Sequence, residues 1–498
     1  MKIRELIDSL VNYQVLGDLK LDKELLGLTN DSRNINRGDA FVAIRGQRFD
    51  GHDVLEQVIG RGVYLVVAEE YTSKQIELAE DKGVTLLKVP STFRAQAILA
   101  NQYFDQPTCS LNVVAVTGTN GKTTTSHFIS QLLELWGRKT GVIGTLHYKI
   151  GDRILSAVNT TPEALTLQRY FKEMVEEGCQ DAVIEASSHA LALGRLWYTD
   201  IDCAIFTNLT REHLDFHQTM DKYANAKSLL FAQLGQQFHQ GKARMAILNI
   251  DDPYYEIMSQ ATAADILTYS MVDPQATVYA DQVEHVANGL NFKLHFNGQS
   301  YSLHLPFLGQ YNIMNYLAAF LCLVYYYECP VQELLDLSRH LKGVTGRMQV
   351  IDEGQPYTVV ADFAHTPDAL RNVLKELKSQ TKKRLMVLFG HSGGNRDSAA
   401  RPELGDILFE WADQIILTAD NPRYEPVQKI VTELVGPHKE KPYMMIEDRE
   451  AAINHLINQA QTGDTLLFAG KAGETYQVIG DEYIPYDEIA LIKKAIQA

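Results

Sequence analysis

Several features that would place this 498-residue chain in common functional classes are missing from it. No stretch approaches the roughly 20 apolar residues that a membrane-spanning helix needs. Residues 1–15 carry acidic side chains where a signal peptide has its apolar core. We therefore expect a cytoplasmic protein with no membrane insertion. The net charge of −16 argues against nucleic acid as a partner, because binding a phosphate backbone requires a basic face.

The sequence also gives little support for cysteine chemistry or for covalent catalysis. The five cysteines include no CxxC pair, and buried thiols explain them best. No convincing Ser/His/Asp or Cys/His set is found, so a protein nucleophile is not expected. What is present is an ordinary globular composition, 45% hydrophobic and 22% charged, in a chain long enough for about three domains.

Short apolar runs alternate with helical patterns along most of the chain. Strands are predicted at 112–116, 181–184, 202–207, 245–249, 357–361, 384–389, 414–418 and 465–468. This alternation predicts an α/β fold, with parallel sheets covered by helices on both faces. The polar, alternating stretch 277–308 predicts inserted antiparallel strands, and 312–327 predicts a helix. In such sheets, ligands bind beyond the carboxyl ends of the strands.

The sharpest local motif is a glycine-rich run between a predicted strand and a predicted helix. Glycines let the backbone approach phosphate, and the amide groups at the helix start face the anion. Lys122 would reach the terminal phosphates, and the Thr123 hydroxyl would hold Mg²⁺. Val116 stands where the strict GxxxxGK[ST] pattern has its first glycine. The run still predicts ATP binding by Gly118, Thr119, Asn120, Gly121, Lys122, Thr123 and Thr124.

Further motifs, together with this loop, show a family resemblance that covers almost the whole chain. They are NDSR at 30–33, NTTP at 159–162, EASSHAL at 185–191, NLTREHLDFH at 208–217, GQYNIMN at 309–315, GVTGRM at 343–348, DFAHTPDAL at 362–370 and DNPR at 420–423. Together they resemble the Mur ligases, and among them the enzymes that add the third residue of the peptidoglycan stem. The resemblance implies a three-domain Mur ligase architecture. Its parts are a UDP-sugar-binding domain at 1–110, a central P-loop-type ATP-binding domain at 111–342, and a Rossmann-like domain for the incoming amino acid at 343–498.

The resemblance also implies roles for single residues. Glu185, His213 and Lys227 would support a second Mg²⁺, with Lys227 carbamoylated, and with Lys122 they form the catalytic set. A carbamate requires a lysine of depressed pKa, since CO₂ adds only to the neutral amine. Further ATP contacts are implied for Asn312, Asn315, Arg347, Asp362 and His365. Contacts with the UDP-sugar peptide are implied for Ser32, Thr160, Thr161, Ser187 and Arg195.

The implied acceptor site comprises Arg396, Asp420, Asn421, Pro422, Arg423, Gly470 and Glu474. Arg423 would grip a distal carboxylate with two hydrogen bonds, which favours meso-diaminopimelate over L-lysine, since L-lysine lacks that group. Two departures from the family pattern leave the acceptor open. Ala472 and Gly473 stand where the family has glycine and histidine, and Ala400 stands where it has a lysine.

The implied reaction is an ATP-dependent, ADP-forming amide ligation by a monomer. The carboxylate of UDP-MurNAc-L-Ala-D-Glu would attack the γ-phosphoryl group of ATP, and the amine of the diamino acid would then attack the acyl phosphate. Such chemistry needs positioning and charge neutralisation only. Three alternatives stay open. They are a paralogue with another amino acid or acyl donor, a catalytically silent binding subunit, and a folylpolyglutamate-type ligase, which the N-terminal domain and the SSHAL segment disfavour.

Replacing Lys122 with alanine should abolish ATP-dependent ligation and leave the fold intact, because the role of this lysine is to neutralise phosphate charge. ADP release is measured beside a thermal unfolding curve for the variant and for the unaltered protein. Near-normal turnover by a folded Lys122→Ala protein would remove the phosphate-loop assignment.

Overall fold

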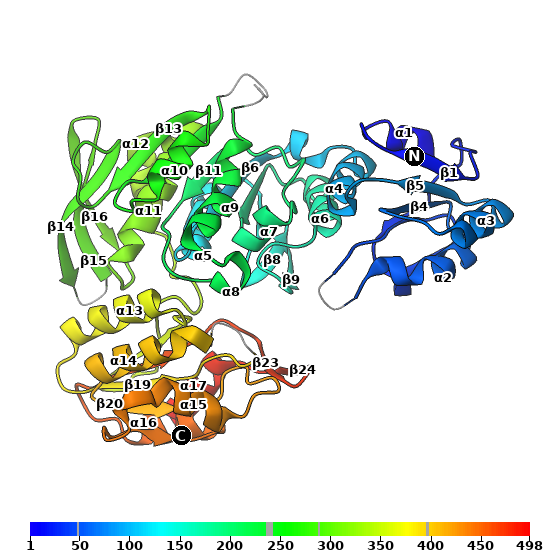
Figure 1. Cartoon of the computed structure of the whole chain (residues 1–498). Helices are drawn as coiled ribbons and strands as arrows, with labels where there is room; N and C mark the ends of the chain where they lie inside the picture. The colour runs from blue at the N-terminus through cyan, green and yellow to red at the C-terminus, as the bar shows by residue number, and fades with distance from the viewer. Residues whose placement is uncertain (47–48, 236–242, 287–288, 395–397) are drawn as a thin grey trace. The chain divides into compact units, whose positions relative to one another are not determined.

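The computed structural model describes residues 1–46, 49–235, 243–286, 289–394 and 398–498, and Figure 1 shows its elements. The chain divides into two compact units. The first comprises Met1–Ala115, Arg138–Ala204 and Ala232–Arg244, and the second comprises Val116–Gly137, Ile205–Phe231 and Met245–Ala498. Strands and helices alternate in both units, so the α/β class predicted from the sequence is confirmed. The three domain boundaries stay a prediction.

The first unit opens with a five-stranded sheet in the order β1-β5-β4-β3-β2, in which only β1 runs antiparallel to its neighbour. Its elements are α1 (Ile3–Ile7), β1 (Gln14–Gly17), β2 (Leu28–Thr29), β3 (Ala40–Val42), α2 (Leu55–Gly60), β4 (Leu65–Ala68), α3 (Ser73–Lys82), β5 (Thr85–Lys88) and α4 (Thr92–Tyr103). Successive residues of β4 face opposite sides of the sheet. Leu65 and Val67 share a core with α1 and α4, whereas Val66 and Ala68 share one with α2 and α3.

The rest of the first unit carries a parallel pair of strands followed by an antiparallel meander. Its elements are β7 (Thr140–Ile143), β8 (His147–Ile150), β9 (Arg153–Ser156), α6 (Ala164–Glu176), β10 (Asp181–Glu185) and α7 (Ser188–Ala192). β10 runs parallel to β7, and β7, β8 and β9 pair antiparallel in turn. All five residues of β10 are buried, and the strand ends at Glu185. β6 (Asn112–Thr117) and β11 (Cys203–Phe206) contribute residues to both units.

The second unit begins around the glycine-rich loop. Its helices are α5 (Lys122–Leu135), α8 (Leu214–His217), most of α9 (Met220–Ala232), α10 (Tyr255–Gln260), α11 (Tyr311–Leu321) and α12 (Val331–Ser338), and its strands are β12 (Met245–Asn249), β13 (Asp265–Ser270), β14 (Val278–Val286), β15 (Gly289–Phe296) and β16 (Gln299–Leu305). β12, β13 and β14 are parallel, whereas β14, β15 and β16 form the antiparallel insertion predicted at 277–308. The helix predicted at 312–327 divides into α11 and a π-type turn at Cys322–Tyr326.

The second unit ends in a six-stranded sheet in the order β17-β18-β22-β19-β20-β21, parallel except at β17. Its strands are β17 (Gln349–Val350), β18 (Thr358–Asp362), β19 (Leu385–Phe389), β20 (Gln414–Leu417), β21 (Met444–Met445) and β22 (Thr465–Ala469), followed by a hairpin of β23 (Tyr476–Ile479) and β24 (Glu482–Pro485). Helices α13 (Pro367–Gln380), α14 (Arg401–Trp411) and α15 (Val427–Val435) share a core with one face, and α16 (Arg449–Asn458) and α17 (Glu488–Gln497) with the other.

This parallel arrangement fixes where the loops emerge. The carboxyl ends of β18, β19, β20 and β22 meet at one edge of the sheet, so the segments that follow them share that edge. Among the loops at this edge are 420–423 and 470–474, both singled out from the sequence. Within the described part of the chain, no helix is long and apolar enough to cross a membrane.

Helix α14 approaches α15 so closely that Gly405 has no room for a side chain. An added Cβ would collide with the Leu434 carbonyl oxygen. Gly405→Ala should therefore lower stability by about 1–3 kcal/mol through overpacking, although alanine is the better helix former. At Gly60 in α2, where nothing lies within 4 Å of an added Cβ, the same change should be neutral or slightly stabilising. Equal thermal unfolding midpoints for the two variants would contradict this packing.

Candidate functional site

The glycine-rich loop joins β6 to α5, and its two glycines are packed without space for a side chain. Gly118 adopts φ +149° and Gly121 φ +86°. An added Cβ would collide with the Thr207 hydroxyl at Gly118 and with the Asn315 amide oxygen at Gly121. Helix α5 begins at Lys122, so its first amide groups and the positive end of its dipole lie at the loop. This arrangement is suited to binding an anion.

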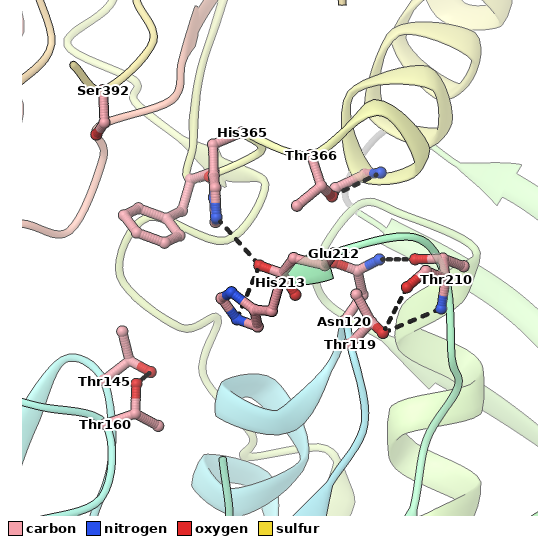
Figure 2. A network of polar contacts seen from close by, with 12 residues as sticks. Thr119, Asn120, Thr145, Thr160, Thr210, Glu212, His213, His365, Thr366 and Ser392 are labelled. Atoms are coloured by element: carbon pink, nitrogen blue, oxygen red, sulfur yellow. Dashed lines mark hydrogen bonds and ion pairs between the residues drawn. The ribbon is translucent and has the colours of Figure 1, made fainter. Parts of the chain in front are cut away.

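Hydrogen bonds attach the loop to the segment that follows β11 (Figure 2). The Thr119 hydroxyl donates to the Thr210 carbonyl oxygen at 3.2 Å and accepts from the Thr210 amide at 3.0 Å. The Asn120 amide N–H donates to the Asn208 side-chain oxygen at 2.9 Å. The side chain of Asn120 donates to Asp368 of α13 at 3.0 Å. The loop is therefore bonded to the first turn of α13, a link that the sequence did not predict.

Two lysines donate to the backbone of this loop. Lys122 Nζ donates to the carbonyl oxygens of Gly118 at 2.9 Å and Thr119 at 2.8 Å. Lys227 Nζ, which α9 supplies, donates to the same Gly118 oxygen at 2.7 Å. The Lys227 side chain is fully buried, although an amphipathic helix would ordinarily expose it. Burial and the charge of Lys122 together hold the pKa of Lys227 well below its ordinary value.

A buried carboxylate, Glu212, faces this pair of lysines. Its Oε1 lies 3.5 Å from His213 Nε2 and 3.6 Å from His365 Nε2 (Figure 2). Burial acts to raise the pKa of Glu212, but His213, His365 and Lys122 outweigh it and hold that pKa well below its usual value. Burial, aided by both lysines, lowers the pKa of His213. Glu212 belongs to a motif noted in the sequence, yet it was given no role there.

Two of the residues expected to contact ATP, Asn312 and Asn315, lie on α11 beside the loop. Asn315 Nδ2 donates to Asn312 Oδ1 at 3.0 Å, and Asn312 Nδ2 donates to the Leu308 carbonyl oxygen at 2.7 Å. Thr125 of α5 donates to Asn315 Oδ1 at 3.2 Å. Thr124 is buried in the first turn of α5. The two asparagines therefore brace α11 against the phosphate loop.

The remaining expected ATP residues cluster around the start of the last sheet. Arg347 donates to the Thr123 hydroxyl at 3.2 Å and stacks 4.7 Å from the Phe363 ring centroid. Asp362 accepts backbone N–H groups from Met348 at 2.6 Å and Ala364 at 2.7 Å. Burial raises the pKa of Asp362. Asp362 thus holds the connection into this sheet in place, whereas Arg347 extends to the start of α5.

In the first unit, polar residues gather around Glu185. The Glu185 side chain is fully buried and accepts from the Thr145 amide at 2.9 Å and the Thr145 hydroxyl at 3.0 Å. The Thr145 and Thr160 hydroxyls lie 3.0 Å apart (Figure 2). Thr161 donates to the Glu185 carbonyl oxygen at 2.6 Å and accepts from the Ser187 amide at 3.1 Å. Thr145 was missed in the sequence, although its position just after β7 was a usable signal.

Arg195 is fixed beside this group. Its guanidinium donates to Glu163 at 2.6 Å and to the Thr161 carbonyl oxygen at 2.9 Å. Its buried Nε has no hydrogen-bond partner among the residues that the structure describes.

Ser32 lies apart from that group in sequence, in a 3-10 turn at Ser32–Asn34. Its carbonyl oxygen accepts from Arg61 at 2.7 Å. Asp50 and His52 line a pocket of about 260 Å³ with Arg45.

The four expected Mg²⁺ ligands belong to different parts of the molecule. Thr123, His213 and Lys227 are in the second unit, and Glu185 is in the first. No three His, Cys, Asp or Glu side chains group closely enough to hold a metal ion in the ranges described above.

The loop after β20 carries the expected acceptor residues in an unusual conformation. Asp420 and Asn421 are buried, and Ser392 donates to Asp420 Oδ2 at 2.6 Å. Arg423 adopts φ +56°, a left-handed conformation that non-glycine residues rarely occupy. Its backbone is held by the Val478 carbonyl oxygen at 3.1 Å and the Gly480 amide at 2.9 Å. Its buried Nε has no hydrogen-bond partner in the described ranges.

The loop after β22 turns back on itself. Gly470 adopts φ +97°, and the Glu474 amide donates to the Lys471 carbonyl oxygen at 3.1 Å, closing a turn with Gly473 at φ +92°. Positive φ at the third residue of a turn favours glycine, which accounts for Gly473. Asn421 Nδ2 donates to Glu474 Oε2 at 2.8 Å, so the structure brings the two acceptor loops together. Arg396 lies outside the described residues.

Three domain models match the chain over most of its length. They are the Mur ligase family, catalytic domain at residues 24–104, the Mur ligase middle domain at 116–323, and the Mur ligase, glutamate ligase domain at 346–472.

Relatives match over full length. The chain is 41% identical over 500 residues to the UDP-N-acetylmuramoyl-L-alanyl-D-glutamate--2,6-diaminopimelate ligase of Geobacillus thermodenitrificans, covering 100% of this chain and 99% of the relative. It is 40% identical to the protein of the same name from Bacillus cereus, covering 100% and 98%. A solved structure of a UDP-N-acetylmuramoyl-L-alanyl-D-glutamate--2,6-diaminopimelate ligase is similar, with a TM-score of 0.68 and 30% identity over 100% of this chain and 99% of that one. The chain therefore belongs to the Mur ligase family of ATP-dependent, amide-forming ligases.

Proposed function

We propose that this protein joins UDP-MurNAc-L-Ala-D-Glu to a diamino acid, with meso-diaminopimelate preferred, in the synthesis of peptidoglycan precursors. The observation that carries the proposal is the pair of lysines at one phosphate loop, of which Lys227 is buried and favoured in its neutral form. The full-length relatives named as 2,6-diaminopimelate ligases support the choice of substrates.

ATP would bind at the glycine-rich loop. The amide groups at the start of α5 would hold its phosphates, and Lys122 would leave the loop carbonyl oxygens to neutralise the terminal phosphate. Arg347, which already extends to Thr123, would add a second positive charge. The donor carboxylate oxygen attacks the γ-phosphorus, the bond to ADP breaks, and an acyl phosphate forms. These charges stabilise the transferring phosphoryl group without a protein nucleophile.

The residues expected to hold Mg²⁺ fit that role chemically. A lowered pKa keeps the His213 imidazole neutral, which is the form that binds metals. Burial and the charge of Lys122 lower the pKa of Lys227, which favours the neutral amine that CO₂ modifies. Thr123 would hold one Mg²⁺, and the family resemblance assigns Glu185, His213 and carbamoylated Lys227 to a second. When bound, these ions supply charge neutralisation at the phosphates.

The acceptor would bind at the carboxyl edge of the last sheet. Arg423 would offer its guanidinium to a distal carboxylate, and Glu474 would offer an anion to a distal ammonium group. The acceptor's neutral amine then attacks the acyl carbon, phosphate leaves with one former carboxylate oxygen, and the nitrogen loses a proton. Both substrates are held in place, so the step requires proximity above all.

The direct test is ADP release from UDP-MurNAc-L-Ala-D-Glu across a panel of amino acids. Release that depends on a diamino acid, with a ligated product of the summed mass, supports the proposal. The altered residues Ala472 and Gly473 favour a second candidate, a paralogue that uses another amino acid. Release with a non-diamino acid alone would select that candidate. A monomeric state and a cytoplasmic location stay predictions from the sequence.

Lys227→Ala should be nearly inactive, and formate or acetate should partly restore its activity by replacing the carbamate charge in the vacated space. The same salts should not restore Lys122→Ala, which serves as the matched control. Mass spectrometry that finds an unmodified Lys227 in fully active protein would overturn this role.

Arg423→Ala should narrow the preference for meso-diaminopimelate over L-lysine, chiefly by weakening meso-diaminopimelate. In the unaltered protein, L-lysine leaves the guanidinium without a carboxylate, and an unpaired group of this kind gives discrimination of roughly 10³-fold. The kcat/KM values for both amino acids decide the point. Arg371→Ala, which removes an exposed arginine of α13, is the control and should change neither value. A native preference for L-lysine would refute the assignment.

A further inference from the structure

A buried lysine joins the two acceptor loops. Lys471 follows β22 and its side chain is fully shielded from solvent. Its Nζ lies 3.0 Å from Asn421 Oδ1, 3.0 Å from Glu474 Oε2 and 3.5 Å from Asp420 Oδ1. No role was expected for Lys471 from the sequence.

The neighbours of Lys471 occupy all the hydrogen-bond donors of its ammonium group. An ammonium has three N–H donors, and three side-chain oxygens surround it here. The ring of Tyr486 lies 5.6 Å from Nζ and adds a further favourable surface. A buried cation is tolerated only when it is paired and hydrogen-bonded, so this ammonium is committed to the loops that hold it. Lys471 has no donor left with which to contact a substrate.

The hydrogen bonds of Lys471 fix the orientation of two acceptor residues. Asn421 Oδ1 accepts from Lys471 and from the Val478 amide at 2.9 Å, which leaves its Nδ2 to donate to Glu474 Oε2 at 2.8 Å. Glu474 Oε2 thus accepts two hydrogen bonds from these partners. Glu474 Oε1 has no hydrogen-bond partner in the described part of the chain, and the side chain is 21% exposed. Oε2 of Glu474 is therefore anchored by the protein, and Oε1 is left to bind a ligand.

We propose that Lys471 is a positioning residue for the acceptor: it anchors Glu474 Oε2 so that Oε1 receives the distal ammonium group of the diamino acid. The inference rests on the proposed function and deepens it, because it explains how the site recognises an amine next to a carboxylate. Because Lys471 bonds to Asn421 in one acceptor loop and to Glu474 in the other, it aligns both loops at once. Discrimination for the distal amine therefore depends on a residue that never touches it.

The test compares two acceptors that differ only in the distal amine, meso-diaminopimelate and 2-aminopimelate. The unaltered protein should favour meso-diaminopimelate by roughly 100-fold in kcat/KM. Lys471→Met should bring that ratio close to one by raising KM for meso-diaminopimelate, with KM for ATP unchanged. Lys471→Gln, which keeps a donor for Glu474, should give an intermediate ratio. Lys378→Met, at an exposed ion pair with Asp413, is the control and should keep the full ratio.

A double variant separates positioning from simple loss of structure. Because Lys471 acts through Glu474, adding Lys471→Met to Glu474→Gln should reduce the ratio no further than Glu474→Gln alone. If Lys471→Met does not fold, the same comparison is made with Lys471→Gln. An unchanged ratio in a folded Lys471 variant overturns the inference and leaves the ligase function standing. Failure of the unaltered protein to ligate any diamino acid overturns both.

Discussion

The side-chain nitrogens of two lysines bond to one carbonyl oxygen, and this competition is the main constraint on the site. Lys122 and Lys227 both donate to the Gly118 oxygen, at 2.9 Å and 2.7 Å. Burial and repulsion from the charge of Lys122 together hold the pKa of Lys227 well below its ordinary value. The loop's glycine packing creates this competition, because it holds the carbonyl groups where both lysines reach them. A neutral, buried lysine beside a phosphate site is the form that CO₂ converts into an anion.

The proposed binding of the acceptor amino acid depends on the topology of the last sheet. Parallel strands deliver their loops to one edge, so residues about 50 positions apart in sequence can share one pocket. Asn421 and Glu474 meet there in a hydrogen bond of 2.8 Å, and Lys471 holds both. Arg423 is held in a left-handed conformation by the hairpin that begins at β23. Local strain of this kind is found at functional sites, where the surrounding structure maintains it.

The sequence predicted the strands well, because their apolar runs are a local property. The run at 112–116 became β6, and 245–249 matches β12. Contacts between distant segments could not be predicted in this way. Lys227 stands in an amphipathic helical pattern at a position where a lysine is ordinarily exposed. Only the fold shows that it is buried. Glu212 meets His365 across 153 positions of sequence, and no local pattern predicts that pairing. The family resemblance supplied residue roles that composition and spacing lack.

The central claim is that the donor carboxylate is activated by phosphorylation and then captured by the acceptor amine. Labelling that carboxylate of UDP-MurNAc-L-Ala-D-Glu with ¹⁸O tests the claim most directly. Mass spectrometry of the released phosphate should show one ¹⁸O per turnover, because the carboxylate oxygen that attacks ATP leaves with the phosphoryl group. The ligated product should retain the other ¹⁸O. Unlabelled phosphate, or AMP and pyrophosphate in place of ADP and phosphate, would contradict the account.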